Sequence, residues 1–253
     1  MFSVSADKQV TFSQGNLQYT QSTNTWSFAR AQWEMIGTDN VTGGSVSSDP
    51  TYGDSKKGTA LADKVDLFGW STSATNFGVS TSTSNYSGSF GDWGTNKIGN
   101  DAPNTWRTLT MEEFAYIRYT RDNAAELIGI AQVNGVNGVI LLPDNWVKPD
   151  SVCFTPSMTN GLFREEGMNG FFRNTTSKSY FDNIYNADQW SLMPQAGAVF
   201  LPAGGYRWRD HIFYVGYHGQ YWSSSLYEKY AVHLMFEWDY VSQIACSRAA
   251  FGY

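Results

Sequence analysis

Short stretches in which apolar and polar residues alternate recur along the chain, and they predict a protein built mainly from short strands. Val10 and Phe12 alternate with polar neighbours near the start of the sequence. Residues 15–35 continue the pattern as short β segments joined by polar turns. Residues 196–203 are apolar almost throughout, which predicts a buried strand.

A helix-start pattern interrupts these strands in the middle of the chain. Thr110 is followed three residues later by Glu113, which is the spacing of a capping box. Apolar residues then recur at intervals of three on one side of the predicted helix: Met111, Phe114 and Ile117. Arg118 lies next to them, so the apolar stripe is narrow. We also expect short helices over Asn123–Ile128 and near Asp188–Met193.

Turn and loop signals fill much of the remaining sequence. Asn137-Gly138 stands between two apolar runs and predicts the turn of a hairpin. Residues 38–60 and 71–105 are rich in Gly, Ser, Thr and Asp, and we expect both to be long ordered loops. Aromatic side chains are expected to pin these loops to the body of the protein: Phe68, Trp70, Phe77, Phe90 and Trp93.

The last third of the chain predicts a small antiparallel sheet. One strand is expected to end at Trp222-Ser-Ser-Ser, and residues 231–237 are expected to form the next strand and turn at Trp238-Asp-Tyr. Alternation places Leu234 and Phe236 on one face of this strand, and His233, Met235 and Glu237 on the other. Together these patterns predict one α+β domain over residues 1–253, with few helices and long irregular loops.

Composition narrows the class of protein. Charged residues and aromatic residues each make up 16% of the chain, beside 24 glycines. The charged share is below the roughly 25% of ordinary domains and favours a loop-rich surface protein over a helical cytosolic enzyme. The net charge is −6 without a basic cluster, so we expect no nucleic-acid partner. No apolar run reaches the roughly 18 residues of a membrane span, and no signal peptide follows Met1.

Candidate metal ligands are scattered rather than clustered. The histidines His211, His218 and His233 form no His-x-x-x-His pair, so we expect neither zinc nor iron. The Glu-Pro-Asn or Gln-Pro-Asp triplet of calcium-dependent lectins is absent, so we expect no calcium. Cys153 and Cys246 favour two free thiols, although a single bridge between them stays open. No metal and no cofactor are therefore predicted.

Candidate catalytic residues are equally sparse. The chain has no Gly-x-Ser-x-Gly elbow. Ser223–Ser225 are expected to make strand-edge hydrogen bonds rather than to supply a nucleophile. Glu165 and Glu166 are adjacent and point different ways, which favours a solvated loop over acid–base chemistry. No catalytic residue is predicted.

The last fifty residues differ in composition from the rest of the chain. Residues 206–253 hold 14 aromatic residues in 48 positions and no asparagine, whereas 17 asparagines precede them. About half of these aromatic side chains are expected in the core, and the others resemble in composition an antibody paratope. The predicted ligand-binding patch, out of phase with Leu234 and Phe236 or in turns around them, comprises Trp208, His211, Tyr214, Tyr217, His218, Tyr227, His233, Met235, Glu237, Trp238 and Tyr240.

Motifs spread over nearly the whole chain resemble a large group of gut-bacterial surface proteins. The opening motifs are Phe2-Ser-Val-Ser-Ala and Val10-Thr-Phe-Ser-Gln-Gly-Asn-Leu-Gln-Tyr. The later motifs, in the same order as in the group, are Asp66-Leu-Phe-Gly-Trp, Trp106-Arg-Thr-Leu-Thr, Asn134-Gly-Val-Asn-Gly-Val-Ile-Leu-Leu-Pro-Asp, Phe200-Leu-Pro-Ala-Gly-Gly-Tyr-Arg and Gly219-Gln-Tyr-Trp-Ser-Ser-Ser. The group is similar to the formylglycine-generating-enzyme type of C-type lectin fold. Some of its members are variable proteins of diversity-generating retroelements, in bacteria or their phages.

The resemblance implies that residues 206–253 form a variable, ligand-binding segment. In such retroelements a reverse transcriptase changes template adenines, often in Asn codons near the C-terminus of the protein, and gives Tyr, His, Asp, Ser, Phe or Ile. Some residues cannot arise in this way from AAC or AAT and belong to the scaffold or to other template codons: Trp208, Glu228, Lys229, Met235, Glu237, Trp238 and Gln243. Because the family usually continues with Ser-Val-Arg, we expect the chain to be truncated at Tyr253.

The expected function is therefore binding rather than catalysis. Enzymes of this fold use reactive cysteines or an iron-binding histidine set, and neither pattern is present; the fold alone would not decide the matter. The resemblance implies a display protein on a cell surface or phage particle that binds a protein or glycan on another cell. A non-diversified lectin or adhesin of the same fold is the alternative, and a formylglycine-generating-enzyme-like oxidoreductase is a remote one. The ligand and the oligomeric state stay open.

Overall fold

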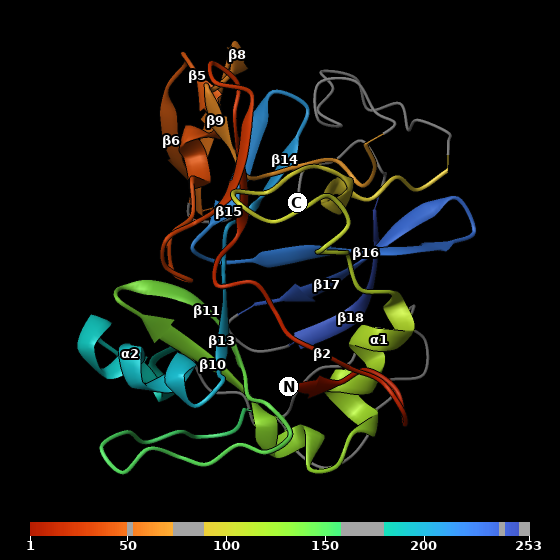
Figure 1. Ribbon diagram of the computed structural model, residues 1–253. Coiled ribbons are helices and arrows are strands. Elements are labelled where there is room, and N and C mark those ends of the chain that lie inside the picture. Colours follow the sequence, from red (N-terminus) through yellow and green to blue (C-terminus); the bar gives the residue numbers. More distant parts are fainter. Residues whose placement is uncertain (50–52, 73–88, 158–179, 238–240, 248–253) are drawn as a thin grey trace.

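The protein is an α+β structure made mostly of small antiparallel sheets, as the sequence predicts. The computed structural model describes residues 1–49, 53–72, 89–157, 180–237 and 241–247. Within these residues the α-helices are α1 (Met111–Ala115) and α2 (Ala187–Gln195), and no helix is long and apolar enough to cross a membrane. Figure 1 shows one group of sheets around β5, β6, β14 and β15, a second around β10, β11 and β13, and strands β16–β18 between them.

The N-terminal third forms short strands, most of which pair with other strands of the same third. Strand β1 (Phe2–Ser3) pairs with β2 (Gln9–Val10), and β3 (Leu17–Thr20) lies between β4 (Thr25–Phe28) and β9 (Lys64–Val65). Between them, residues 38–60 were expected to be a loop, and this prediction is wrong. They form β5 (Val41–Thr42), β6 (Val46–Asp49), β7 (Gly53–Lys57) and β8 (Ala60–Leu61). Backbone pairing with distant β15 holds β7 in place, so the polar side chains do not reveal the strand.

The predicted loop over residues 71–105 is confirmed in part. Residues 73–88, with Phe77, lie outside the described residues. Phe68 and Trp70 are buried, and the indole of Trp70 donates to the Ser223 carbonyl at 2.8 Å. Trp93 lies in a 3₁₀ turn over Trp93–Thr95 and donates to the Gly69 carbonyl at 2.9 Å. These contacts fix the segment to the core, as expected.

The helix start at Thr110 is confirmed together with its capping box. The Thr110 hydroxyl accepts from the Glu113 backbone N–H, and the Glu113 carboxylate accepts from the Thr110 N–H. Helix α1 continues as a π-helical turn over Tyr116–Thr120, and a 3₁₀ turn follows over Ala124–Leu127. Phe114 and Ile117 of the apolar stripe belong to the main core with Phe236, whereas Met111 is half-buried and outside that cluster. Arg118 is also buried, so burial extends beyond the predicted stripe.

The second group is a single four-stranded sheet with the strand order β12-β10-β11-β13. Its strands are β10 (Ile128–Val133), β11 (Val136–Leu141), β12 (Ile184–Tyr185) and β13 (Val199–Pro202). The hairpin is confirmed, but its turn lies at Asn134-Gly135, where both residues have positive φ, and not at Asn137-Gly138. Gly138 lies inside β11. This position requires a glycine, because a Cβ there would lie 2.4 Å from the Phe200 ring and from the Leu201 carbonyl oxygen.

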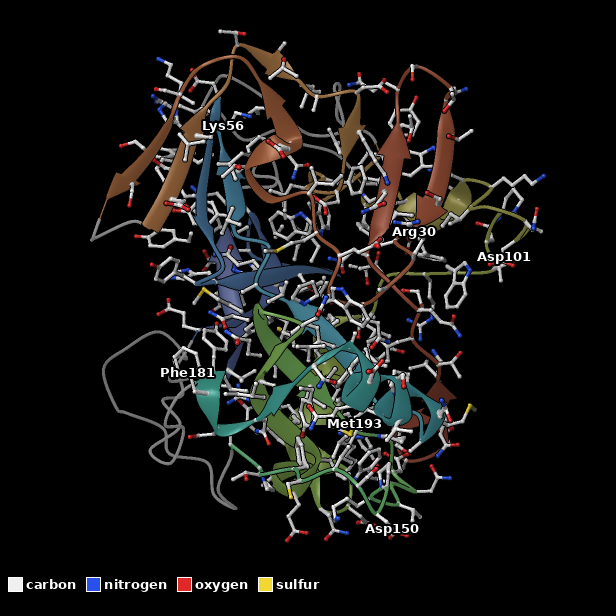
Figure 2. The ribbon with its side chains drawn as sticks, turned by 90° about the vertical axis from the view of Figure 1, so that its left-hand side faces the viewer. Arg30, Lys56, Asp101, Asp150, Phe181 and Met193 are labelled. Carbon is white, nitrogen blue, oxygen red and sulfur yellow. The ribbon has the colours of Figure 1, made fainter. Side chains whose placement is uncertain are left out.

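Helix α2 covers one side of this sheet, where the sequence predicts a weak helix. Asn186 caps its first turn in a capping box with Gln189. Trp190 and Met193 are fully buried against Phe200 and neighbouring apolar residues. Figure 2 shows Met193 on α2 in the lower half of the molecule and Lys56 on β7 in the upper half. The buried strand expected over residues 196–203 is β13, which lies beside α2.

The C-terminal strands form two further sheets. Strands β14 (Tyr206–Trp208) and β15 (His211–Val215) form a hairpin that belongs to a sheet of order β14-β15-β7-β6. The other sheet has the order β16-β17-β18. Strand β16 (Gly219–Tyr227) was expected to end at the serines, but it continues past them through a register shift between Trp222 and Leu226. Strand β17 (Tyr230–Phe236) and β18 (Val241–Ser247) confirm the hairpin predicted in this region.

Both faces of β17 are covered, which corrects the predicted exposure of one face. Leu234 and Phe236 pack into the main core, as expected. His233 and Met235 lie on the other face but are only 2% and 9% exposed. The His233 ring meets the Trp222 indole edge to face with centroids 5.5 Å apart. Alternation places side chains on the two faces of a strand but does not say which face meets water.

Candidate functional site

A row of ring-bearing side chains lies on the outer face of hairpin β14–β15 and on the turn that follows it. We call this row the aromatic ladder; its members are Tyr206, Trp208, His211, Phe213, Tyr214 and His218. The register pairs Tyr206 with Phe213 and Trp208 with His211, so alternation brings these four to one face. Trp208 is 38% exposed and the other members are half-buried. Figure 1 shows the hairpin in the same group of sheets as β5 and β6.

Backbone geometry adds Tyr214 to this face. Regular alternation would turn Tyr214 to the inner face after Phe213. However, Tyr214 has a φ of +59°, and the pairing with β7 shifts by one residue between Ile212 and Val215. Such a bulge re-aims a side chain, so Tyr214 stacks with the outer row. The positive φ is unfavourable for a residue with a Cβ, and surrounding contacts must maintain it.

The rings stack on one another rather than standing alone. Tyr206 stacks with Phe213 and with Tyr214, each at a centroid distance of 5.7 Å. His211 stacks on Phe213 at 5.5 Å, and Tyr214 stacks on His218 at 4.1 Å. Such ring pairs add about 0.5–1.5 kcal/mol each beyond their buried area. The ladder is therefore a preorganised surface.

Charged groups border both ends of the ladder. At one end, His218 Nε2 lies 2.9 Å from Glu237 Oε1. At the other end, His211 Nδ1 lies 2.7 Å from Asp210 Oδ1, and Asp210 also lies 3.7 Å from the Lys57 ammonium. Burial raises the pKa of Asp210, but the hydrogen bond from His211, a backbone hydrogen bond and nearby positive charge together outweigh it, so the pKa is lowered. These groups give the ladder a polar border.

The inner face of the same hairpin is tightly packed. Arg207 and Ile212 are at most 1% exposed, and an Arg207 guanidinium nitrogen donates to the Leu67 carbonyl. Burial lowers the pKa of Arg207 to about 9, although the negative charge of Asp66 raises it. Burial likewise raises the pKa of Asp66, which accepts hydrogen bonds from Asn40 and from the Ile36 N–H. The ladder thus stands on a backbone that the core holds rigid.

The structure brings about half of the residues of the predicted patch together on one surface. Trp208, His211, Tyr214 and His218 belong to the ladder, and the His218 contact brings Glu237 to it. Tyr217 is 53% exposed, and its N–H donates to the Tyr214 carbonyl. Tyr206 and Phe213 were not predicted, although their alternation with Trp208 and His211 could have indicated them.

Three of the remaining predicted members do not join this surface, and two lie outside the described residues. His233 and Met235 are buried on β17, so they cannot contact a ligand at the surface. Burial in an apolar setting lowers the pKa of His233 to about 3. Tyr227 is 57% exposed but lies at the far end of β16, paired with Tyr230. Trp238 and Tyr240 lie outside the described residues.

Other candidate chemistry resolves into structural contacts where the structure describes it. The Ser223 hydroxyl donates to the Val232 carbonyl at 2.9 Å, and Ser225 Oγ accepts from the Met111 N–H at 3.0 Å, which confirms strand-edge hydrogen bonding. Cys153 is an exposed free thiol. The described residues contain no group of three or more His, Cys, Asp or Glu that could hold a metal ion. The Glu165–Glu166 pair and the Cys246 side chain lie outside the described part.

Comparison with known proteins adds no relative. No model of a protein family matches the chain, and no similar sequence or fold was found among curated proteins and solved structures.

Proposed function

We propose that this protein is a non-enzymatic ligand-display protein whose aromatic ladder binds a protein or glycan presented by another cell. The observation that carries the proposal is the ladder itself, which exposes stacked rings on one face of a hairpin whose other face is buried. Tyr and Trp give large contact area for little lost rotamer entropy, and a rigid base reduces the entropy lost on binding.

The stacking favours a protein ligand over a glycan. Tyr214 lies between Tyr206 and His218, so much of its two faces is covered by other rings. A ring covered in this way can offer a ligand its edge and hydroxyl group rather than its faces. Edges and hydroxyl groups are suited to the mixed apolar and hydrogen-bonding contacts of a protein interface.

We further propose that a retroelement diversifies the ladder. Tyr206, His211, Phe213, Tyr214 and His218 are residues that adenine changes in an Asn codon produce. These residues are half-buried, so substitutions there should disturb folding less than substitutions in the core. His233 and Met235 are excluded from this proposal because both are buried.

Sequencing the gene segment that encodes the ladder in many cells of the source population tests diversification. We expect substitutions concentrated at the codons of the ladder and a neighbouring reverse-transcriptase gene with a near-copy of this segment. An invariant segment without that neighbour would instead support the alternative, a non-diversified surface lectin or adhesin.

A further inference from the structure

A cavity of about 270 Å³ opens where the N-terminal strands, the Trp93 segment and the C-terminal third meet. Apolar side chains make most of its wall, among them Phe12, Phe28, Trp93, Trp106 and Leu201. Thr11 and Arg107 also line the cavity and are exposed, so it reaches the surface. An apolar cavity of about 150 Å³ is enough to bind benzene in another protein, so this cavity can hold a larger ring system.

Gln220 belongs to this wall and has an unpaired side-chain oxygen. The residue lines the cavity from β16 and is only 8% exposed. Its side-chain oxygen Oε1 is buried and has no hydrogen-bond partner in the structure. Neighbouring polar groups are satisfied, because Tyr221 donates to the Pro202 carbonyl at 2.9 Å and Trp106 donates to Asp101 at 2.7 Å. Buried amide oxygens are normally hydrogen-bonded, so Gln220 indicates a missing partner.

Charge in the wall favours a neutral occupant. Asp66 and Asp92 belong to the lining, and their negative charge disfavours an anion. Arg107, also in the lining, is held by Glu113 through contacts of 2.6 and 2.7 Å, so its charge is already compensated. A cation would meet this guanidinium and lose its own hydration in an apolar cavity, which is unfavourable.

We propose that the cavity binds a small neutral aromatic molecule, about the size of indole, whose N–H or O–H donates to Gln220 Oε1. The apolar wall supplies burial, and the single carboxamide fixes the orientation of the ring, which is the usual division of roles in small-molecule sites. This site is separate from the aromatic ladder, and the inference does not depend on the proposed display function.

The test uses indole, phenol and toluene as probes with the full chain. We expect millimolar indole to shift the backbone amide resonances of cavity residues such as Leu17, Leu201 and Gly205 in a saturable way. Gln220→Leu removes the acceptor, so it should weaken indole and phenol about tenfold and leave toluene unchanged. Gly204→Leu should abolish binding of all three probes, because Gly204 lines the cavity and a Cβ there meets open space.

Thermal melts without probe establish that each variant folds, and Leu17→Trp fills the same cavity if Gly204→Leu does not fold. Three results would overturn the proposal. The first is no saturable shift with indole, as expected if only water enters. The second is indole binding that survives in the filled-cavity variant. The third is equal indole affinity in Gln220→Leu and the unaltered protein.

Discussion

The ring of Tyr214 lies parallel to the ring of His218, with centroids 4.1 Å apart and an interplanar angle of 16°. The two residues are joined through the backbone as well, since the His218 N–H donates to the Tyr214 carbonyl at 3.0 Å. Tyr214 holds its position despite a φ of +59°. Stacking and backbone strain therefore act in opposite directions at this residue.

Replacement of Tyr214 should separate these two effects. Tyr214→Ser removes the stacking and keeps a Cβ at positive φ, so the free energy of unfolding should fall by about 1 kcal/mol. Tyr214→Gly removes the same ring but adopts positive φ freely, so it should be the less destabilised variant. Urea denaturation of the two variants checks this order. A Gly variant less stable than the Ser variant would show that strain at this position is unimportant.

An exposed aromatic residue beside the ladder and an aromatic residue of the core should respond differently to the same substitution. Phe236 is fully buried and stacks on Tyr221, whereas Tyr217 is 53% exposed. We expect Phe236→Ser to lower stability by roughly 3–5 kcal/mol, the range of large-to-small core changes. Tyr217→Ser should lower it by under about 0.5 kcal/mol. Thermal melts measure both, and similar losses would mean that the surface is part of the core.

Acid should destabilise the fold through His233. Burial lowers its pKa from 6.5 to about 3, so the folded state holds it neutral while the unfolded chain binds a proton below pH 6.5. Its stabilising contribution is therefore complete above pH 6.5 and falls by about 1.4 kcal/mol per pH unit until pH 3. His233→Gln should lose that share of the pH dependence between pH 7 and 5. Parallel pH profiles of the two proteins would contradict this assignment.

Glu113 should contribute to stability through its charge. Burial alone raises its pKa, but hydrogen bonds from Arg107, the Thr110 N–H and Lys8 outweigh this and lower the pKa to about 2. The contribution is thus present above pH 4.5 and lost as pH falls toward 2. Glu113→Gln at pH 7 should cost about 1–3 kcal/mol. Exposed Glu112→Gln makes the same charge change and should cost little; equal effects would exclude the network as the cause.

Local signals in the sequence predicted local structure well. The capping box at Thr110 depends on residues three apart, so the sequence alone contains its chemistry. The hairpin turn was assigned to Asn137-Gly138, but Asn134-Gly135 offers the same signal three residues earlier and forms the turn. Contact with Phe200, far along the chain, decides between them by requiring a glycine at position 138.

Long-range pairing explains what the sequence did not reveal about the site. Strand β7 has little apolar character, and its pairing with β15 joins segments more than a hundred residues apart. That pairing contains the bulge that adds Tyr214 to the ladder. Burial of His233 likewise depends on β16, through the ring of Trp222. Alternation identified the faces, but only the tertiary arrangement determined which face is covered.

The central claim is that the aromatic ladder can change and bind while the core stays folded. The most direct measurement compares two display libraries, one randomised at Tyr206, His211, Phe213, Tyr214 and His218, and a control randomised at five buried positions: Phe114, Ile130, Leu201, Leu234 and Phe236. Yeast display scores resistance to protease, and sorting against a soluble protein such as streptavidin scores binding. We predict that most ladder variants stay folded and yield streptavidin binders, whereas few control variants fold. A ladder library that folds as rarely as the control, or folds but yields no binder, would contradict the account.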